Sequence, residues 1–306
     1  DLVWIKQRSA TRAHALFDIV RGANKRLRSD DTNAEVTSTN QLSAFLSNGF
    51  TIDDNNTVNV SGGTYVGWAW DAGSSTGSNT DGSITSTVRA NQSAGFSVVS
   101  WDGTSANATV GHGLNAAPEF IITKVRGMTS NWYCYHTGLT DATKYIWLNS
   151  TAAEGTQTAA WNSTDPTSSV IHVGGEAEVN RNGYNTIAYC FAPVAGYSAF
   201  GSYTGNGSAD GPFVFTGMRP AWIMVKRTDS SGNWVIMDSS RDEYNYSRSY
   251  LEANDSAAEG TFAGNGFSLL SNGFKLEQTT NSTNASSANY IYAAFAEHPF
   301  KTARAR

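Results

Sequence analysis

The chain of 306 residues has a net charge of −5, and only 15% of its residues are charged, against about a quarter in an ordinary soluble domain. This balance argues against a nucleic-acid binder, which would carry a basic face, and no apolar run of about 18 residues predicts a membrane-spanning helix. Aromatic residues reach 12%, and Ser, Thr, Asn and Gly dominate the remainder, a composition typical of an all-β protein with polar turns.

One short segment returns three times along the chain. Its copies are DLVWIKQR at residues 1–8, EFIITKVR at 119–126 and AWIMVKR at 221–227. Each is an apolar run followed by a Lys and then an Arg within two residues. In the second and third copies a Pro, Pro118 or Pro220, stands six residues before the Lys. Runs of β-branched and aromatic residues predict a strand in each copy.

A second segment recurs downstream of the first and begins at Asn59, Asn180 and Asn284. Its distances from the Lys of the first segment are 59 − 6 = 53, 180 − 124 = 56 and 284 − 226 = 58 residues. Near-constant spacing between two landmarks indicates one structural unit that is used repeatedly. The period is longer than that of solenoid repeats, so it favours tandem domains.

We therefore divide the chain into a first unit at residues 1–72, a Gly/Ser/Thr/Asn-rich linker at 73–95, a second unit at 96–195 and a third at 196–306. In the first unit, apolar runs bounded by turn residues predict strands; these are residues 2–6, 15–18, 49–53 and 64–70.

The second unit opens with the strand-like residues 96–101 and the third unit with a similar stretch at Phe200, and we align Gly103 with Gly207 as the turn after each. The first unit has no such opening strand. We expect the parent polypeptide to carry one about 20 to 30 residues before Asp1, with a Pro directly before Asp1, as the repeat implies.

Regularly spaced short strands with turns between them predict β-sandwiches or jelly rolls. The expected fold is all-β, with tandem β-sandwich or jelly-roll-like units related by an internal repeat. A single pseudo-threefold body with the units side by side is the alternative. Thr32 with Glu35, Thr151 with Glu154 and Ser256 with Glu259 follow the capping-box pattern, which predicts one short helical turn in each unit.

No pattern in the sequence predicts a metal or cofactor site. HExxH and paired His-x-His motifs, the nucleophile elbow and the phosphate-binding loop are all missing. The two cysteines, Cys134 and Cys190, lie in apolar runs and are interpreted as buried free thiols, with a disulfide as the alternative. The five histidines are scattered: His14, His112, His136, His172 and His298.

Carboxylates were considered as glycosidase candidates, because that chemistry needs two of them across a cleft. The candidates are Asp238, Asp242, Glu243 and Glu252. The Asp-x-x-Arg pair at Asp238 recurs at Asp18, so a structural salt bridge is the preferred interpretation, and no catalytic residue is predicted.

The repeated lysines Lys6, Lys124 and Lys226 could bind anions. We favour the interpretation that each closes a strand and holds its charged end in water.

Aromatic side chains on the surface could stack on sugars. Trp132 and Trp234 occupy equivalent places in the repeat, so both are expected in the core. Trp161 is flanked by polar residues and has no partner in the repeat. It is therefore our candidate ligand-binding aromatic.

The segments at residues 1–9, 111–118, 200–207 and 290–297 resemble an uncharacterised repeat domain of tailed-phage virion proteins. That domain occurs in virion structural and tail-fibre-like proteins, especially those of marine cyanophages and related phages. The resemblance covers nearly the whole chain and brings no assigned catalytic residues. It implies a place on the virion surface, other virion proteins as partners, and homotrimers, which are common among fibres.

The leading hypothesis is a non-enzymatic tail-fibre or spike module that attaches to host-surface glycans. A capsid decoration or head-fibre protein without a ligand is the second hypothesis, and a glycan depolymerase is the third. An aromatic cluster on one face of one unit would favour glycan attachment. Uniformly polar outer faces with apolar patches between subunits would favour the second hypothesis.

Overall fold

A computed structural model describes residues 1–296, and in this part of the chain nearly all regular structure is antiparallel β-sheet. The two helices are single turns, α1 (Ala177–Asn180) and α2 (Asn281–Asn284). No helix among the described residues has the length and apolar character that crossing a membrane requires. The predicted all-β class is confirmed.

The first sheet has the strand order β2-β1-β7. Its strands are β1 (Leu2–Gln7), β2 (Ala15–Asp18) and β7 (Tyr65–Trp70). Two hairpins accompany it. They are β3 (Lys25–Arg26) with β4 (Val36–Thr37), and β5 (Leu42–Leu46) with β6 (Gly49–Ile52). The strands predicted in this region are confirmed, and Asn48 lies in the turn of the second hairpin.

The second sheet has eight strands in the order β15-β14-β13-β12-β17-β10-β9-β8, and β11 pairs with β16 in a separate small sheet. The strands are β8 (Thr76–Asn79), β9 (Ser86–Asn91), β10 (Phe96–Asp102), β11 (Ala108–Gly111), β12 (Phe120–Val125), β13 (Tyr133–His136), β14 (Lys144–Trp147), β15 (Gly155–Thr156), β16 (Val170–Val173) and β17 (Asn185–Phe191). The prediction of a linker at residues 73–95 is wrong, because β8 and β9 lie there and β9 pairs with β10. Small polar residues hid the alternation that buries Ser86 and Val88.

The third sheet has the order β18-β26-β20-β21-β22-β23, and its small companion sheet has the order β19-β25-β24. The strands are β18 (Ser198–Thr204), β19 (Phe213–Phe215), β20 (Pro220–Arg227), β21 (Trp234–Asp238), β22 (Ser249–Glu252), β23 (Gly260–Thr261), β24 (Gly266–Leu270), β25 (Gly273–Glu277) and β26 (Asn289–Ala296). The remainder of the predicted third unit, including His298, lies outside the described residues.

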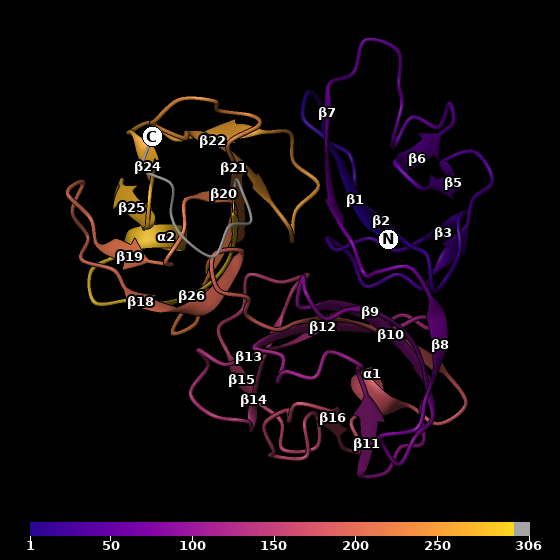
Figure 1. The fold of residues 1–306 in the computed structure, drawn as a ribbon. Coiled ribbons are helices and arrows are strands. Elements are labelled where there is room, and N and C mark those ends of the chain that lie inside the picture. The colour runs from indigo at the N-terminus through magenta and orange to yellow at the C-terminus, as the bar shows by residue number, and fades with distance from the viewer. Residues whose placement is uncertain (297–306) are drawn as a thin grey trace.

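Each large sheet has buried residues on both of its faces. One face of all three contributes to a single central cluster, and the other face packs separately against β5–β6, β11–β16 or β19-β25-β24. Figure 1 shows the three large sheets around the middle of the molecule and the smaller β-structures on its outside. A strand that is buried on both faces has apolar residues at nearly every position. This explains why the repeated segments are continuous apolar runs.

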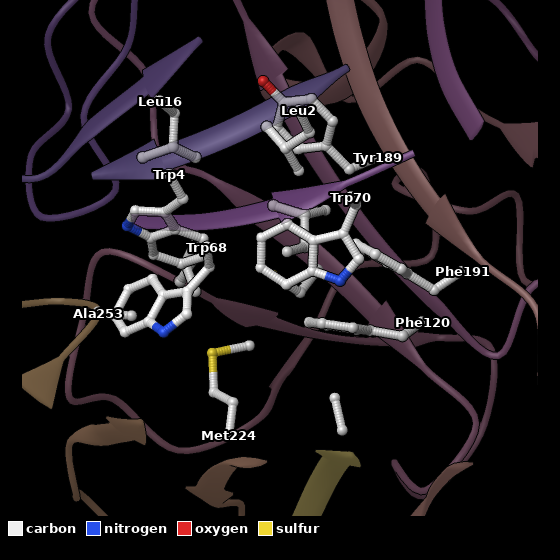
Figure 2. Close-up of a cluster of buried hydrophobic side chains, with 14 of the residues drawn as sticks. Leu2, Trp4, Leu16, Trp68, Trp70, Phe120, Tyr189, Phe191, Met224 and Ala253 are labelled. Carbon is white, nitrogen blue, oxygen red and sulfur yellow. The ribbon is translucent and has the colours of Figure 1, made fainter. Parts of the chain in front are cut away.

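The central cluster is dominated by aromatic rings from all three sheets (Figure 2). The Trp70 ring stands at right angles to Trp222, with 5.5 Å between ring centroids, and lies 6.2 Å from Phe191 and 5.7 Å from Phe295. The cavity among these side chains is only about 10 Å³, so the centre has no room for more than about one water molecule.

The capping-box prediction of helical turns at residues 32–35, 151–154 and 256–259 is wrong, because these segments are loops. Their glutamates face other partners, described below. The turn alignment also needs correction. The Gly103 amide donates to Tyr184 and the Gly205 amide to Ala288, so Gly205, two residues before Gly207, is the counterpart of Gly103.

Candidate binding surface

The three repeated lysines are fully buried, and the prediction that their charged ends lie in water is wrong. Each ammonium group donates to backbone carbonyls of a loop from another sheet. Lys6 Nζ lies 2.7 Å from Ala257 O, Lys124 Nζ 3.1 Å from Thr32 O, and Lys226 Nζ 2.8 Å from Ala152 O. These carbonyls fill the places that an anion would need.

The lysine contacts define three junctions between the large sheets. In the first junction, residues 28–35 of the first sheet's loops meet residues 124–132. In the second, residues 147–154 meet residues 226–234. In the third, residues 252–259 meet residues 6–14 and close the ring. Burial lowers the pKa of Lys6 and Lys124 to about 8 and that of Lys226 to about 7.

A ring nitrogen makes a second bond at every junction. Trp132 Nε1 donates to Arg28 O at 2.7 Å, and Trp234 Nε1 donates to Trp147 O at 2.8 Å. At the third junction His14 takes the place of the tryptophan, with Nε2 3.0 Å from a backbone carbonyl. Both tryptophans are buried, as predicted.

The two Asp-x-x-Arg pairs are buried salt bridges, as the preferred interpretation predicted. Asp18 binds Arg21 and accepts from Tyr189 Oη at 2.8 Å. Asp238 binds Arg241 at 2.6 Å and accepts from Trp68 Nε1 at 3.0 Å. Each carboxylate therefore joins its own loop to the neighbouring sheet.

His136 takes the corresponding place in the second sheet, and its Nε2 lies 3.0 Å from Tyr292 O. Burial lowers the pKa of His136 to about 4 and that of His14 to about 3. His112 is also buried, and His172 is half-buried. No group of three His, Cys, Asp or Glu residues suited to a metal ion occurs among residues 1–296.

The remaining candidate carboxylates support loops or face solvent. Asp242 accepts from the amides of Arg248 and Ser249 at 2.7 and 2.6 Å, and Glu252 accepts from Asn233 at 2.7 Å. Glu243 is exposed.

Cys134 and Cys190 are buried free thiols, as predicted. Burial raises the pKa of Cys190 to about 12, which leaves the thiol protonated and unreactive at neutral pH.

Trp161 is only 2% exposed, and the prediction that it is a surface aromatic is wrong. Its ring lies edge-on to Tyr135, with 6.0 Å between centroids, in the core between the second sheet and its small companion. The polar residues around it form turns, and such turns can enclose a ring as well as expose one.

Exposed aromatic side chains gather instead on the small sheet β19-β25-β24. Phe213 is 46% exposed and Phe215 is 66% exposed. Because side chains alternate along a strand, both lie on the outer side of β19, while Val214 between them is buried. The Phe213 ring packs over Gly273 of β25, where a Cβ atom would stand 2.9 Å from it.

A loop with two more aromatics extends this sheet on its other side. Ser247 bridges to Phe267, and Asn245 exchanges two hydrogen bonds with the backbone of Leu269, at 3.0 and 2.9 Å. Tyr244 and Tyr246 of this loop are 78% and 44% exposed.

The strand register arranges these side chains in two rows across the sheet. One row runs Phe213, Lys275, Ser268, and the other runs Phe215, Gly273, Leu270. Tyr244 and Tyr246 come from the loop beside β24. We call the exposed and half-buried side chains of this region the aromatic face; it comprises Phe213, Phe215, Tyr244, Tyr246, Leu270 and Lys275.

Polar groups border the aromatic face. Lys275 pairs with Asp210 at 2.5 Å, and Glu277 accepts from Ser268 Oγ at 3.1 Å. The sequence analysis missed this face, although the alternation of Phe213 and Phe215 around a single valine was a usable signal.

A second surface feature is a cleft of about 1110 Å³ beside the first sheet. It is lined by the β5–β6 turn, by Ala69 and Trp70 at the end of β7, and by Arg89 and Asn91 of β9. Arg89 pairs there with Asp1 at 3.1 Å, and Asn91 donates to Asp71 at 3.0 Å.

Comparison with known proteins gives one result. The family model DUF7483, described as a domain of unknown function, matches residues 1–299. No curated protein and no solved structure matches the chain.

Proposed function

The chain belongs to the domain-of-unknown-function family DUF7483, and we propose that it is a non-enzymatic virion module that attaches a phage to host-surface glycans. The observation that carries this proposal is the aromatic face. Sugars present flat C–H surfaces that pack on aromatic rings, while their hydroxyl groups bond to polar neighbours. Four exposed rings, two on β19 and two on the neighbouring loop, together with Lys275 and Glu277, supply both kinds of contact.

We further propose that the three large sheets belong to sandwich units related by one internal repeat. The support is the recurrence of the same bonds at each junction. A buried lysine on β1, β12 or β20 donates to carbonyls of the neighbouring loop, and a ring nitrogen of His14, Trp132 or Trp234, at the start of β2, β13 or β21, bonds to a second carbonyl. An internal repeat would also explain why the lysines and the residues that contact these carbonyls are spaced alike along the sequence.

The place on the virion and the oligomeric state are part of the proposal. The sequence resemblance implies a fibre or spike at the particle surface, and homotrimers among its partners. Three copies of the aromatic face would raise the avidity for a repeated surface glycan without a tight single site. Sedimentation of the purified chain measures the oligomeric state directly.

The test is binding of the purified protein to a glycan array and to host cell-surface polysaccharide. We expect Phe215→Ala and Tyr244→Ala each to weaken binding by roughly tenfold, because stacking on one ring contributes about 1 to 1.5 kcal/mol. Val36→Ala and Leu46→Ala are matched controls, since both residues are exposed and apolar but lie away from this face.

Equal binding by all four variants would contradict glycan attachment through the aromatic face. If the protein binds no glycan, and phage particles made with the Phe215→Ala variant no longer contain the protein, the face is a contact with another virion protein. That outcome would support the capsid-decoration or head-fibre hypothesis instead. Cleavage of the polysaccharide by the wild-type chain would support the depolymerase hypothesis.

A further inference from the structure

Strand β7 has one open edge. Among residues 1–296 it pairs only with β1. Its counterparts β17 and β26 each have two neighbours, since β17 pairs with β12 and β10, and β26 pairs with β20 and β18. The missing neighbour of β7 corresponds to the opening strands β10 and β18. Open edges present unpaired amide and carbonyl groups to any extended chain.

Residues beside this edge are exposed in the first sheet and buried in the second. Gly67 and Ala69 of β7 are exposed. The residues that occupy the same register positions in β17, Ala188 and Cys190, are fully buried.

The β5–β6 hairpin is also uncovered. In its counterpart β24–β25, strand β19 lies along β25, and a Cβ atom at Gly273 would meet Val214 O at 2.1 Å. At Gly49, which follows the same Asn-Gly turn sequence, a Cβ atom would meet nothing within 4 Å. Leu46 at this turn is 54% exposed.

Asn59 does not make the contacts that its counterparts Asn180 and Asn284 make. Asn180 and Asn284 are fully buried, and each holds the loop after an opening strand. Asn180 Oδ1 accepts from Thr104 N at 3.0 Å, and Asn284 Oδ1 accepts from Asn206 N at 2.9 Å. Asn59 is exposed and holds no such loop among the described residues.

The end of β7 and the β5–β6 hairpin line the cleft of about 1110 Å³, through Phe45, Gly49, Phe50, Ala69 and Trp70. We propose that the edge of β7 and this cleft form the docking site for one extended strand of the β10 and β18 type, followed by a short strand of the β19 type. This inference rests on the repeat relation proposed above. The occupant is contributed by polypeptide on the amino side of Asp1.

The spacing fixes where the occupant must lie. The strands β10 and β18 both begin 28 residues before the buried lysine (124 − 96 and 226 − 198) and end 22 residues before it. The docked strand therefore occupies the residues 28 to 22 before Lys6. A strand in this place comes from the same polypeptide in both other units, which favours the same source here over a second copy.

The occupant also needs a glycine directly after its strand. A Cβ atom at Gly103 would lie 2.1 Å from Arg181 O, and one at Gly205 would lie 2.3 Å from Ala285 O. Val60 follows Asn59 as Arg181 follows Asn180, so the backbone there sets the same limit. Both known strands end in Ser, an aromatic residue and one variable residue, and this Gly follows directly.

The experiment appends a copy of residues 198–220 directly before Asp1, which reproduces the spacing of the third unit. We expect amide hydrogen exchange of β7 to slow by about 100-fold, because its free edge becomes paired. We expect Tm to rise by about 5 °C as the apolar side chains around the cleft are covered. The control carries Gly205→Val in the appended copy alone and should show neither effect.

Asn59→Ala provides an independent readout. It should leave the Tm of the unextended chain unchanged and lower that of the extended chain by about 3 °C, since only the extended chain gives the amide a loop to hold. If the extended chain does not fold, the same 23-residue segment added as a free peptide should bind, and Asn59→Ala should weaken it about tenfold.

Unchanged exchange of β7 in the extended chain, or equal protection by the Gly205→Val control, would overturn the proposal. A concentration-dependent dimer of the unextended chain that protects β7 would assign the edge to a second copy and overturn it as well. Glycan binding plays no part in these readouts, so the two proposals fail independently.

Discussion

The first and third junctions differ from the second in one respect. At the first, Glu35 binds Arg126 from the neighbouring sheet at 2.9 Å and Arg21 from its own at 3.2 Å. At the third, Glu259 likewise binds Arg8 at 2.8 Å and Arg241 at 3.1 Å.

At the second junction, Glu154 accepts only from Thr140 within residues 1–296, because Thr228 stands where Arg8 and Arg126 stand elsewhere. The lysine and the ring nitrogen are present at all three junctions. We call the glutamate bound by two arginines the clamp, which is Glu35 at the first junction and Glu259 at the third. Because the second junction lacks a clamp, the contribution of the lysine to stability can be compared with and without one.

The largest effect is expected when the shared contact is removed. Lys6→Met, Lys124→Met and Lys226→Met should each lower the free energy of unfolding by about 3 kcal/mol or more, because two or more buried carbonyls lose their donor. Denaturant unfolding of the three variants measures this loss. Similar losses at all three junctions would agree with a shared role, whereas a small loss at the unclamped second junction would contradict it.

A smaller effect is expected when the clamp is broken. Glu35→Gln leaves the buried Arg21 with one carboxylate partner fewer, and we expect the free energy of unfolding to fall by about 2 kcal/mol. Burial alone would raise the pKa of Glu35, but Arg126 and Arg21 hold it below its usual value, so the charged form is the stable one. The matched change Glu154→Gln at the second junction should cost less than about 0.5 kcal/mol. Equal losses would mean that the clamp adds nothing to its junctions.

Acid should act first on the two histidines that take the place of tryptophan and aspartate. His14 accepts from Trp4 Nε1 at 2.7 Å, and His136 accepts from Gly138 N at 2.9 Å, so both rings are held neutral. Their folded pKa values, about 3 and about 4, lie below the unfolded value of about 6.5. The unfolded chain therefore binds more protons as the pH falls below about 6.5, and stability is lost in that direction.

Between pH 6.5 and 5 each histidine should lower the free energy of unfolding by about 2 kcal/mol. The clamps do not interfere in this window, because unfolded glutamates take up protons only near pH 4.3. Unfolding of wild type and of the double variant His14→Gln/His136→Gln across this range measures the effect. An identical pH dependence in the two proteins would contradict it.

Periodicity and propensity were enough to predict the elements of the sheets but not their packing. Residues 2–6, 15–18 and 64–70 became strands as expected, and both cysteines are buried. The linker assignment failed at residues 73–95 because Ser and Thr can occupy a strand when the neighbouring strand supplies the apolar contacts. A sequence shows propensity but not which strand will lie alongside.

The buried lysines and Trp161 show the same limit for the candidate sites. A lysine at a strand end has the same sequence whether it reaches water or the carbonyls of a distant loop, and here the loops come from residues 32, 152 and 257. Trp161 was judged from its polar neighbours, but contacts with β13 and the β11–β16 sheet bury it. Only the tertiary arrangement distinguishes these cases.

The smallest expected effect comes from completing the second junction. Thr228→Arg would place a guanidinium group opposite Glu154, as Arg126 stands opposite Glu35. Glu154 lies at a partly exposed site, so the gain should be about 0.5 kcal/mol and should shrink in 1 M salt, where such pairs are screened. The double variant Thr228→Arg/Leu139→Arg would add a counterpart of the buried Arg21, but Leu139 belongs to the central cluster, and the loss of its packing should outweigh any ionic gain. A clear stabilisation by the double variant would show that the stability of this junction is limited by missing charge and not by the packing of Leu139 and His136.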